Sequence, residues 1–239
     1  MARLPFALAL ALGGLALPPG AALGRPAVGA DGLERLGRRQ VLTYTDPGSN
    51  GINKGKAIGV FDATPDEVFR VVTDFEHYQD FAPRVVAARV VDRQGPDRAL
   101  VWLASDLPWP VSKAWVTAQF EYDRIAPDVY RIRFHQLQGS MRRYEGSIYI
   151  EPWTKWKNGG TSVVTYELLA EPDSMAPRRL INARLEEVVA KYVHFLRQHI
   201  NELRRAGRLH PELPPDPNLA SPLAGSKQPR AVTDVAQRP

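Results

Sequence analysis

Apolar and polar residues alternate along the middle of the chain with a period of two. Between positions 116 and 122 the even positions hold Val, Ala, Phe and Tyr, and the odd positions that follow each hold Thr, Gln, Glu and Asp. Similar patterns predict strands over 85–92, 98–104, 112–122, 129–136, 142–150 and 161–170, separated by turns of Gly, Pro or Asp. An antiparallel sheet that is covered on one side typically has one apolar, buried face and one polar, solvent-exposed face. We therefore expect a single curved antiparallel sheet.

Helical signals flank these strands. A strand over 56–62 is followed by an N-cap, Thr64, and by Pro65 and two acidic residues, which together predict a short helix. The aromatic residues within 75–81 predict a second helical turn that inserts into the core. Apolar residues then recur with helical spacing over 178–205, which corresponds to a helix of about 40 Å. A helix of that length is long enough to cross the whole sheet.

Changes in composition divide the chain into four parts. We interpret 1–24 as a signal peptide and 25–53 as a looser leader, in which a short helix over 33–39 is compatible with the sequence. The folded domain is expected over 54–206. From 207 to 239 the chain is rich in Pro and Ala and has no period of 2 or 3.6, so this tail is expected to be disordered.

The interpretation of 1–24 rests on three features. There is a basic residue near the start, an apolar run shorter than a bilayer span, and a set of small residues at the end. An uncleaved anchor or a buried helix is the alternative, but Pro18, Pro19 and Gly20 would interrupt a helix there. We therefore expect a periplasmic or secreted protein.

Charge and cysteine content narrow the possible chemistry. The 239 residues carry a formal net charge of +5 and contain no cysteine, which excludes thiol catalysis, zinc–thiolate sites and redox sensing. A modest positive charge is compatible with an anionic membrane surface as a partner. Nucleic acid is not expected as a partner, because the basic residues are scattered among acidic ones.

Catalytic motifs are missing from the sequence. The five histidines have no metal-binding spacing; they are His77, His135, His194, His199 and His210. The chain also lacks a G-x-S-x-G motif, a nucleotide-binding glycine motif and a recognisable pair of carboxylates. We therefore expect no catalytic residue, no metal and no cofactor.

Three motifs, in order along the chain, resemble the START-like superfamily, also called SRPBCC, helix-grip or Bet v 1-like proteins, and in particular its START lipid-binding domains. They are the aromatic turn over 74–78 with Pro83, the Pro-Trp-Pro segment over 107–112, and the segment over 171–182 that leads into the last helix. The resemblance implies an α+β helix-grip fold, a curved antiparallel sheet wrapped around a long C-terminal helix. Where many START proteins have an Arg-Asp pair, this chain has Ala114 and Trp115. We therefore expect a cavity that is more apolar than in those relatives.

A curved sheet closed by one helix is not always filled by its own side chains, and small residues here alternate with widely spaced aromatic ones. We expect an internal cavity for a hydrophobic ligand. The expected lining residues are Phe75, Tyr78, Phe81, Trp102, Trp109, Ala118, Phe120, Phe134, Met141, Tyr144, Tyr166, Leu185, Val189 and Tyr192. An ordinary packed core would use the same residue types.

The expected function is binding, and transfer, of a lipid-like or polycyclic small molecule. Its mechanism would be sequestration, with the C-terminal helix and nearby loops moving to admit the ligand. The alternative is an enzyme of the same fold, similar to polyketide cyclases and aromatases, with Tyr78, Arg89, Tyr144 and Tyr166 as the groups that assist. A third possibility is a protein-interaction role in which the cavity is vestigial.

Overall fold

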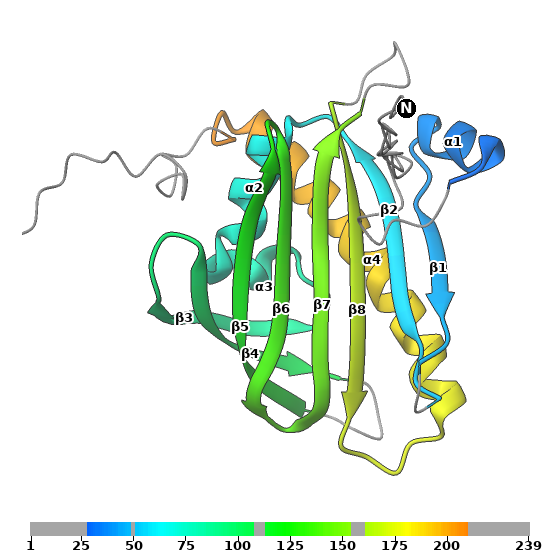
Figure 1. Cartoon of the computed structure of the whole chain (residues 1–239), viewed down its shortest axis with the longest axis vertical. Coiled ribbons are helices and arrows are strands. Elements are labelled where there is room, and N and C mark those ends of the chain that lie inside the picture. The colour runs from blue at the N-terminus through cyan, green and yellow to red at the C-terminus, as the bar shows by residue number, and fades with distance from the viewer. Residues whose placement is uncertain (1–27, 49–50, 108–112, 154–160, 210–239) are drawn as a thin grey trace, which may run out of the picture.

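A computed structural model describes residues 28–48, 51–107, 113–153 and 161–209. Within them, an 8-stranded antiparallel sheet has the order β1-β2-β8-β7-β6-β5-β4-β3. A long helix, α4 (Arg178–Arg205), lies along its concave face (Figure 1). This is the α+β helix-grip arrangement that the sequence predicts.

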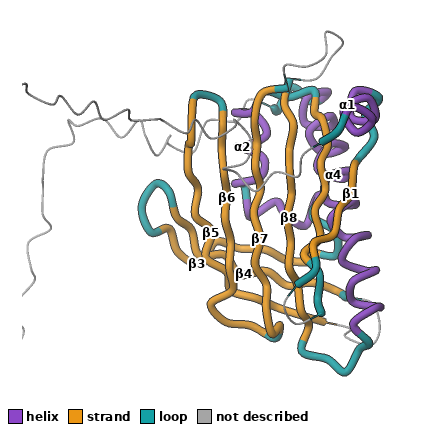
Figure 2. Tube along the Cα trace, turned by 45° about the vertical axis from the view of Figure 1, so that its right-hand side comes forward, coloured by secondary structure: helices purple, strands orange, loops and turns teal. Residues whose placement is uncertain are grey.

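Seven of the eight strands match segments that the sequence predicts, and β1 is the exception. The strands are β1 (Leu42–Asp46), β2 (Lys54–Phe61), β3 (Val85–Arg93), β4 (Arg98–Asp106), β5 (Lys113–Ala126), β6 (Val129–Gly139), β7 (Met141–Pro152) and β8 (Ser162–Pro172). Every neighbouring pair is antiparallel, and register shifts interrupt the β3–β4, β5–β6 and β7–β8 pairs. Such bulges increase twist and bend a strand. In Figures 1 and 2, β3 and β4 accordingly run crosswise to the long strands β6 to β8.

The first core helix begins as its sequence predicts. In α2 (Pro65–Thr73) the Thr64 side chain accepts a hydrogen bond from the backbone N–H of Glu67, and the Glu67 carboxylate accepts one from the Thr64 N–H. This reciprocal pair satisfies two backbone donors that a helix start leaves free. The 3₁₀ turn η2 (Phe75–His77) and helix α3 (Tyr78–Phe81) follow. The predicted aromatic turn is thus present, and its three aromatic rings are buried.

Two glycines allow α4 to approach the sheet closely. A Cβ atom at Gly59 of β2 would lie 2.4 Å from Val193, and one at Gly55 would lie 3.2 Å from both Leu185 and Val189. Real Cβ atoms do not approach a carbon atom as closely as 2.4 Å. The absence of these side chains therefore sets the distance between β2 and the helix.

The N-terminal boundary differs from the one expected. Within 25–53, the helix α1 (Ala30–Gly37) precedes β1, which pairs with β2 from Leu42↔Ile58 to Asp46↔Lys54. Leu36 packs on the outer face of the sheet in a second apolar cluster with Leu42, Ile58, Val60 and Val163. The structured region therefore begins before residue 54. The sequence missed β1 because a five-residue edge strand has too few positions to show a period.

The predicted end of the domain, the segment 1–24 and the tail lie at or beyond the ends of the described region. Leu209 is buried in the main core, so packing continues just past the predicted end of the domain at 206. Residues 1–24 and the tail from 210 lie outside the described residues. No helix in the described ranges is both long and apolar enough to cross a membrane.

Candidate ligand cavity

A cavity of about 190 Å³ lies between the concave face of the sheet and the N-terminal half of α4. Side chains from α3, β4, β5, β6, β7, β8 and α4 line it, together with the turn between α3 and β3. The lining includes Ala82, Leu103, Ala114, Val116, Ile148, Leu168, Ala170, Leu180 and Val188 beside a group of aromatic residues. The space therefore remains because α4 spans a sheet that bends away from it.

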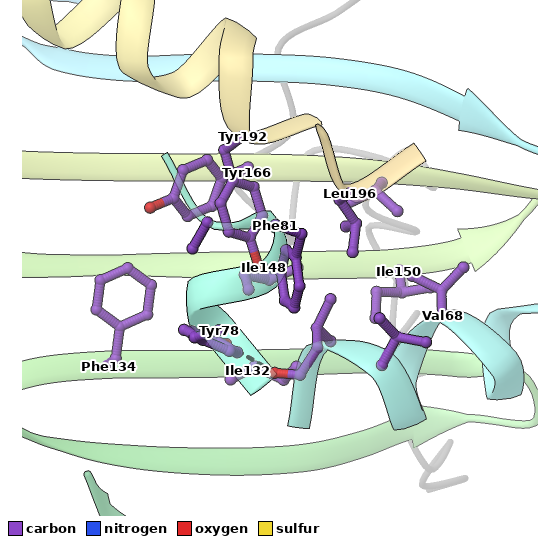
Figure 3. Close-up of a cluster of buried hydrophobic side chains, with 14 of the residues drawn as sticks. Val68, Tyr78, Phe81, Ile132, Phe134, Ile148, Ile150, Tyr166, Tyr192 and Leu196 are labelled. Atoms are coloured by element: carbon purple, nitrogen blue, oxygen red, sulfur yellow. Dashed lines mark hydrogen bonds between the residues drawn. The ribbon is translucent and has the colours of Figure 1, made fainter. Parts of the chain in front are cut away.

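Aromatic rings form a nearly continuous wall around this space. The ring centroids of Phe120 and Phe134 are 5.2 Å apart, and those of Phe134 and Tyr144 are 5.3 Å apart. Tyr166 of β8 stacks on Tyr192 of α4 at 4.1 Å, and Figure 3 shows the two together below the helix. Stacked and tilted aromatic pairs at these distances are attractive. The wall is thus rigid and apolar on most of its surface.

Four tyrosine hydroxyls and the side chain of Ser105 are uncharged polar groups of the described lining. The Tyr78 hydroxyl donates to the backbone carbonyl of Val72 at 2.7 Å, drawn as a dashed line in Figure 3. The hydroxyls of Tyr144 and Tyr166 make no hydrogen bond among the described residues. The buried Tyr192 hydroxyl lies close to that of Tyr78 but has no partner with acceptable hydrogen-bond geometry in the described chain.

Burial keeps these tyrosines protonated. It raises the pKa of Tyr78, Tyr166 and Tyr192 well above the usual value. Nearby tyrosines raise it further, although the interaction with the Tyr192 hydroxyl lowers the pKa of Tyr78. Burial alone raises the pKa of Tyr144. Removal from water disfavours the phenolate, which is charged, relative to the neutral phenol. At neutral pH the interior therefore offers neutral hydroxyl groups.

Charged groups gather at the rim of the cavity. On the exposed side of α4, the Glu187 carboxylate lies 2.5 Å from Lys191 Nζ and 3.0 Å from the Arg184 guanidinium. Hydrogen bonds from Lys191 and then Arg184 lower the pKa of Glu187. Arg84, which has a left-handed φ of 68°, lines the opposite side. The rim thus carries more positive than negative charge, whereas the interior is neutral.

The cavity lining determines which ligands the site can hold. The described residues contain no group of three or more His, Cys, Asp or Glu side chains that could hold a metal ion. In its interior the described lining offers aliphatic and aromatic surface with phenol hydroxyls. Such a site can hold an apolar molecule and donate hydrogen bonds to it.

Eight of the residues that the sequence predicts for the cavity do line it. They are Tyr78, Phe120, Phe134, Met141, Tyr144, Tyr166, Leu185 and Tyr192. They come from six different elements, and the helix and the curved sheet bring them together.

Four others belong to the packed core behind the wall. Phe75 is fully buried and packs on Phe120 with centroids 4.6 Å apart. Phe81 stacks on His199 at 5.3 Å. Ala118 and Val189 are both 0% exposed and do not line the cavity. These residues point inward, but neighbouring side chains fill the space in front of them.

Trp102 lies on the other face of the sheet. The inward residues of β4 are Ala99, Val101 and Leu103, all buried, and Trp102 alternates with them. Its ring packs under the guanidinium of Arg89, with Cζ 5.1 Å from the ring centroid. The expectation that Trp102 lines the cavity is therefore wrong, because the strand parity turns it outward. Arg89 accompanies it outside, and Trp109 lies outside the described residues.

Sequence reasoning missed part of the lining. Leu168 and Ala170 of β8 share the parity of Tyr166, so the alternation could have identified them. Arg84 could not be found that way, because its position depends on a left-handed backbone at the end of the turn after α3. The residues of α4 that face the cavity likewise depend on how the helix is rotated about its axis.

Residues 61–197 match the profile of a family described as polyketide cyclase/dehydrase and lipid transport. No curated protein sequence matches the chain.

Solved structures share the fold. A STAR-related lipid transfer protein fragment from Xanthomonas axonopodis aligns with a TM-score of 0.59 and 20% identity, over 67% of this chain and 93% of that one. Human STARD10 aligns with a TM-score of 0.60 and 13% identity, over 74% and 76%. The Zhui aromatase/cyclase from a Streptomyces species aligns with a TM-score of 0.50 and 16% identity, over 64% and 96%.

At these identities the structural likenesses show the fold alone, whereas the family profile covers more than half of the chain. The profile, the curved sheet around α4 and the cavity between them agree with one another. The chain belongs to the polyketide cyclase/dehydrase and lipid transport family of the START-like superfamily.

Proposed function

We propose that the protein binds a hydrophobic small molecule in the cavity and sequesters it from water, without converting it. The observation that carries the proposal is the distribution of polarity. The interior is apolar and aromatic with neutral hydroxyls, and the charged side chains of Arg84, Arg184, Glu187 and Lys191 lie at the rim. A ligand that buries about 200 Å² of apolar surface would gain roughly 5 kcal/mol at about 25 cal/mol per Å², before the costs of ordering.

The cavity volume restricts the size of the ligand. Its 190 Å³ lies below the range of about 300–1,000 Å³ that is common for drug-sized ligands. It exceeds the cavity of about 150 Å³ that holds benzene in an engineered protein. A compact ligand of one or two rings fits, or one end of a longer molecule whose remainder leaves through the rim.

Uptake and release require an opening. Met141, at the β6–β7 turn, and Leu180 to Val188 on α4 lie between the cavity and solvent. We propose that these segments move apart to admit the ligand, and that the opening faces an anionic membrane during transfer. Because residues 1–24 have the features of a signal peptide, we place this exchange in the periplasm or outside the cell.

Native mass spectrometry of protein purified from its own host tests the proposal. We expect an adduct that organic extraction releases as an apolar molecule. In the variant Ala114→Phe the new ring enters the cavity, so the adduct should be lost. Ala126→Phe is the matched control, because Ala126 is an exposed residue on the same strand. An unliganded wild-type protein that also takes up no apolar probe would contradict the proposal.

A cyclase or dehydrase activity is the second candidate. The tyrosine hydroxyls favour it, because phenol groups in an apolar cavity can polarise a carbonyl group by donating hydrogen bonds. Their raised pKa values make them poor bases at neutral pH. Incubation of the extracted molecule with fresh protein separates the two functions. Binding leaves its mass and retention unchanged, whereas a dehydrase product lacks one water and a cyclase product elutes differently.

A further inference from the structure

Two of the cavity tyrosines differ from other buried tyrosines of the protein. Tyr130 donates its hydroxyl to Asp66, and the Tyr122 hydroxyl interacts with the Arg93 side chain. Tyr78 donates to a backbone carbonyl. A buried phenol hydroxyl is normally paired in this way, because water that it loses must be replaced by another partner.

Tyr144 of β7 and Tyr166 of β8 do not follow this rule. Both line the cavity, and their hydroxyls make no hydrogen bond among the described residues. Tyr144 is close enough to Tyr166 to influence its ionisation. The Tyr192 ring stacks on Tyr166 at 4.1 Å, but the Tyr192 hydroxyl interacts with that of Tyr78. Two donors from neighbouring strands therefore face one cavity without a protein partner.

We propose that these two hydroxyls form a polar subsite that selects a compact, uncharged ring compound bearing an oxygen acceptor, such as a ketone or a hydroxyl. Donors without a protein partner are satisfied by a matching acceptor on the ligand, and a pure hydrocarbon leaves them unpaired. An ionised ligand is not favoured in the interior, because the cationic groups that line the cavity lie at its rim. This inference rests on the proposed function, since it names the class of ligand for the same cavity.

Three probes with the same bicyclic skeleton test it. Tetralin is the hydrocarbon, tetralone carries one carbonyl group, and tetralin carboxylate carries a negative charge. Isothermal titration of the full chain should show tetralone binding about three- to tenfold more tightly than tetralin, as expected for one or two net hydrogen bonds. The carboxylate should bind no more tightly than tetralin.

Single substitutions locate the effect. Tyr144→Phe and Tyr166→Phe keep the rings and remove one hydroxyl each. At least one of them should abolish the preference for tetralone and leave the affinity for tetralin unchanged or improved. Tyr122→Phe is the matched control, because that buried tyrosine does not line the cavity. It should retain the full preference.

The results of these titrations distinguish a failure of the polar subsite from a failure of the proposed binding function. If tetralin and tetralone bind equally well, the polar subsite is wrong and the apolar cavity remains a binding site. Tighter binding of the carboxylate would overturn the selection for uncharged ligands and would assign recognition to the rim cations. If no probe binds to the wild-type protein, both the subsite and the proposed binding function fail.

Discussion

Two alanines on the same face of β5 differ in whether they border the cavity. Ala114 and Ala118 have the same strand parity, and both point toward α4. Ala114 lines the cavity, whereas Ala118, four residues further along the strand, is 0% exposed and lies outside the lining. Phe120, the next residue of β5 on the same face as Ala118, packs on Phe75 with ring centroids 4.6 Å apart.

Substitution by leucine should therefore have opposite consequences at the two sites. Ala118→Leu overpacks the core and is expected to lower the free energy of unfolding by about 1–3 kcal/mol. Ala114→Leu places the added atoms in the cavity, so stability should change less and ligand uptake should fall. Urea unfolding and binding of an apolar fluorescent probe measure the two effects. A stable Ala118→Leu variant with reduced uptake would mean that the cavity extends further than its lining indicates.

At the scale of elements, α4 has two roles along its length. Its C-terminal half packs on the sheet, where Val193 meets Gly59, and buries Leu196 and Ile200. Its N-terminal half covers the cavity, and the segment from β8 to α4 forms part of the rim. In that segment Met175 is 100% exposed, and on β5 Trp115 at the rim is 42% exposed. Exposed apolar side chains beside a cavity mouth are suited to contact a membrane.

Basic residues near these apolar side chains lead to a prediction about membranes. Arg84 at the rim and Lys113 at the start of β5 are both exposed. The protein should bind vesicles that contain phosphatidylglycerol more tightly than neutral phosphatidylcholine vesicles, and salt should weaken the binding. The double variant Arg84→Glu and Lys113→Glu should bind several-fold less in a sedimentation assay.

A charge-matched control tests whether the basic residues at the rim or the net charge of the protein cause the vesicle binding. Arg204→Glu and Arg205→Glu make the same change at the other end of α4, away from the cavity. These substitutions should reduce vesicle binding much less. Equal losses in the two double variants would show that overall charge, rather than the rim, attracts the protein to the membrane.

For the whole molecule, the structured region extends beyond the family profile. The profile begins at residue 61, whereas α1, β1 and most of β2 precede that position. These elements complete one side of the sheet and cover the outer face of β2 with Leu36. Arg197 of α4 donates to the backbone carbonyl of Arg39, which links the start of the fold to its last helix.

Localisation is the prediction that concerns the full chain. Deletion of residues 1–24 should leave the protein in the cytoplasm, whereas the full-length gene product should be found outside the cytoplasm and shortened at its N-terminus. Mass spectrometry of the N-terminal peptide in each fraction tests this. An intact Met1 on protein that remains cytoplasmic would contradict the proposed export. The deletion leaves α1 and every strand in place.

The sequence by itself determined the elements and their faces. β-Branched and aromatic residues between turns, with alternation in several segments, predicted the strands from β2 to β8, and the cap at Thr64 predicted the start of α2. These features depend on interactions within a few residues, such as side-chain parity and helix capping, so local sequence is sufficient for them. The order of the motifs was also sufficient to identify the superfamily, which the family profile confirms.

Only the tertiary structure decided which inward residues border empty space. Ala114 and Ala118 are indistinguishable by pattern, and the outward turn of Trp102 follows from the register of β4 between β3 and β5. The presence of Tyr144, Tyr166 and Tyr192 in one cavity lining likewise depends on the bend of the sheet and the rotation of α4. A cavity is what remains after all side chains have packed. Its boundary is therefore set by contacts between residues far apart in the chain, which no local pattern records.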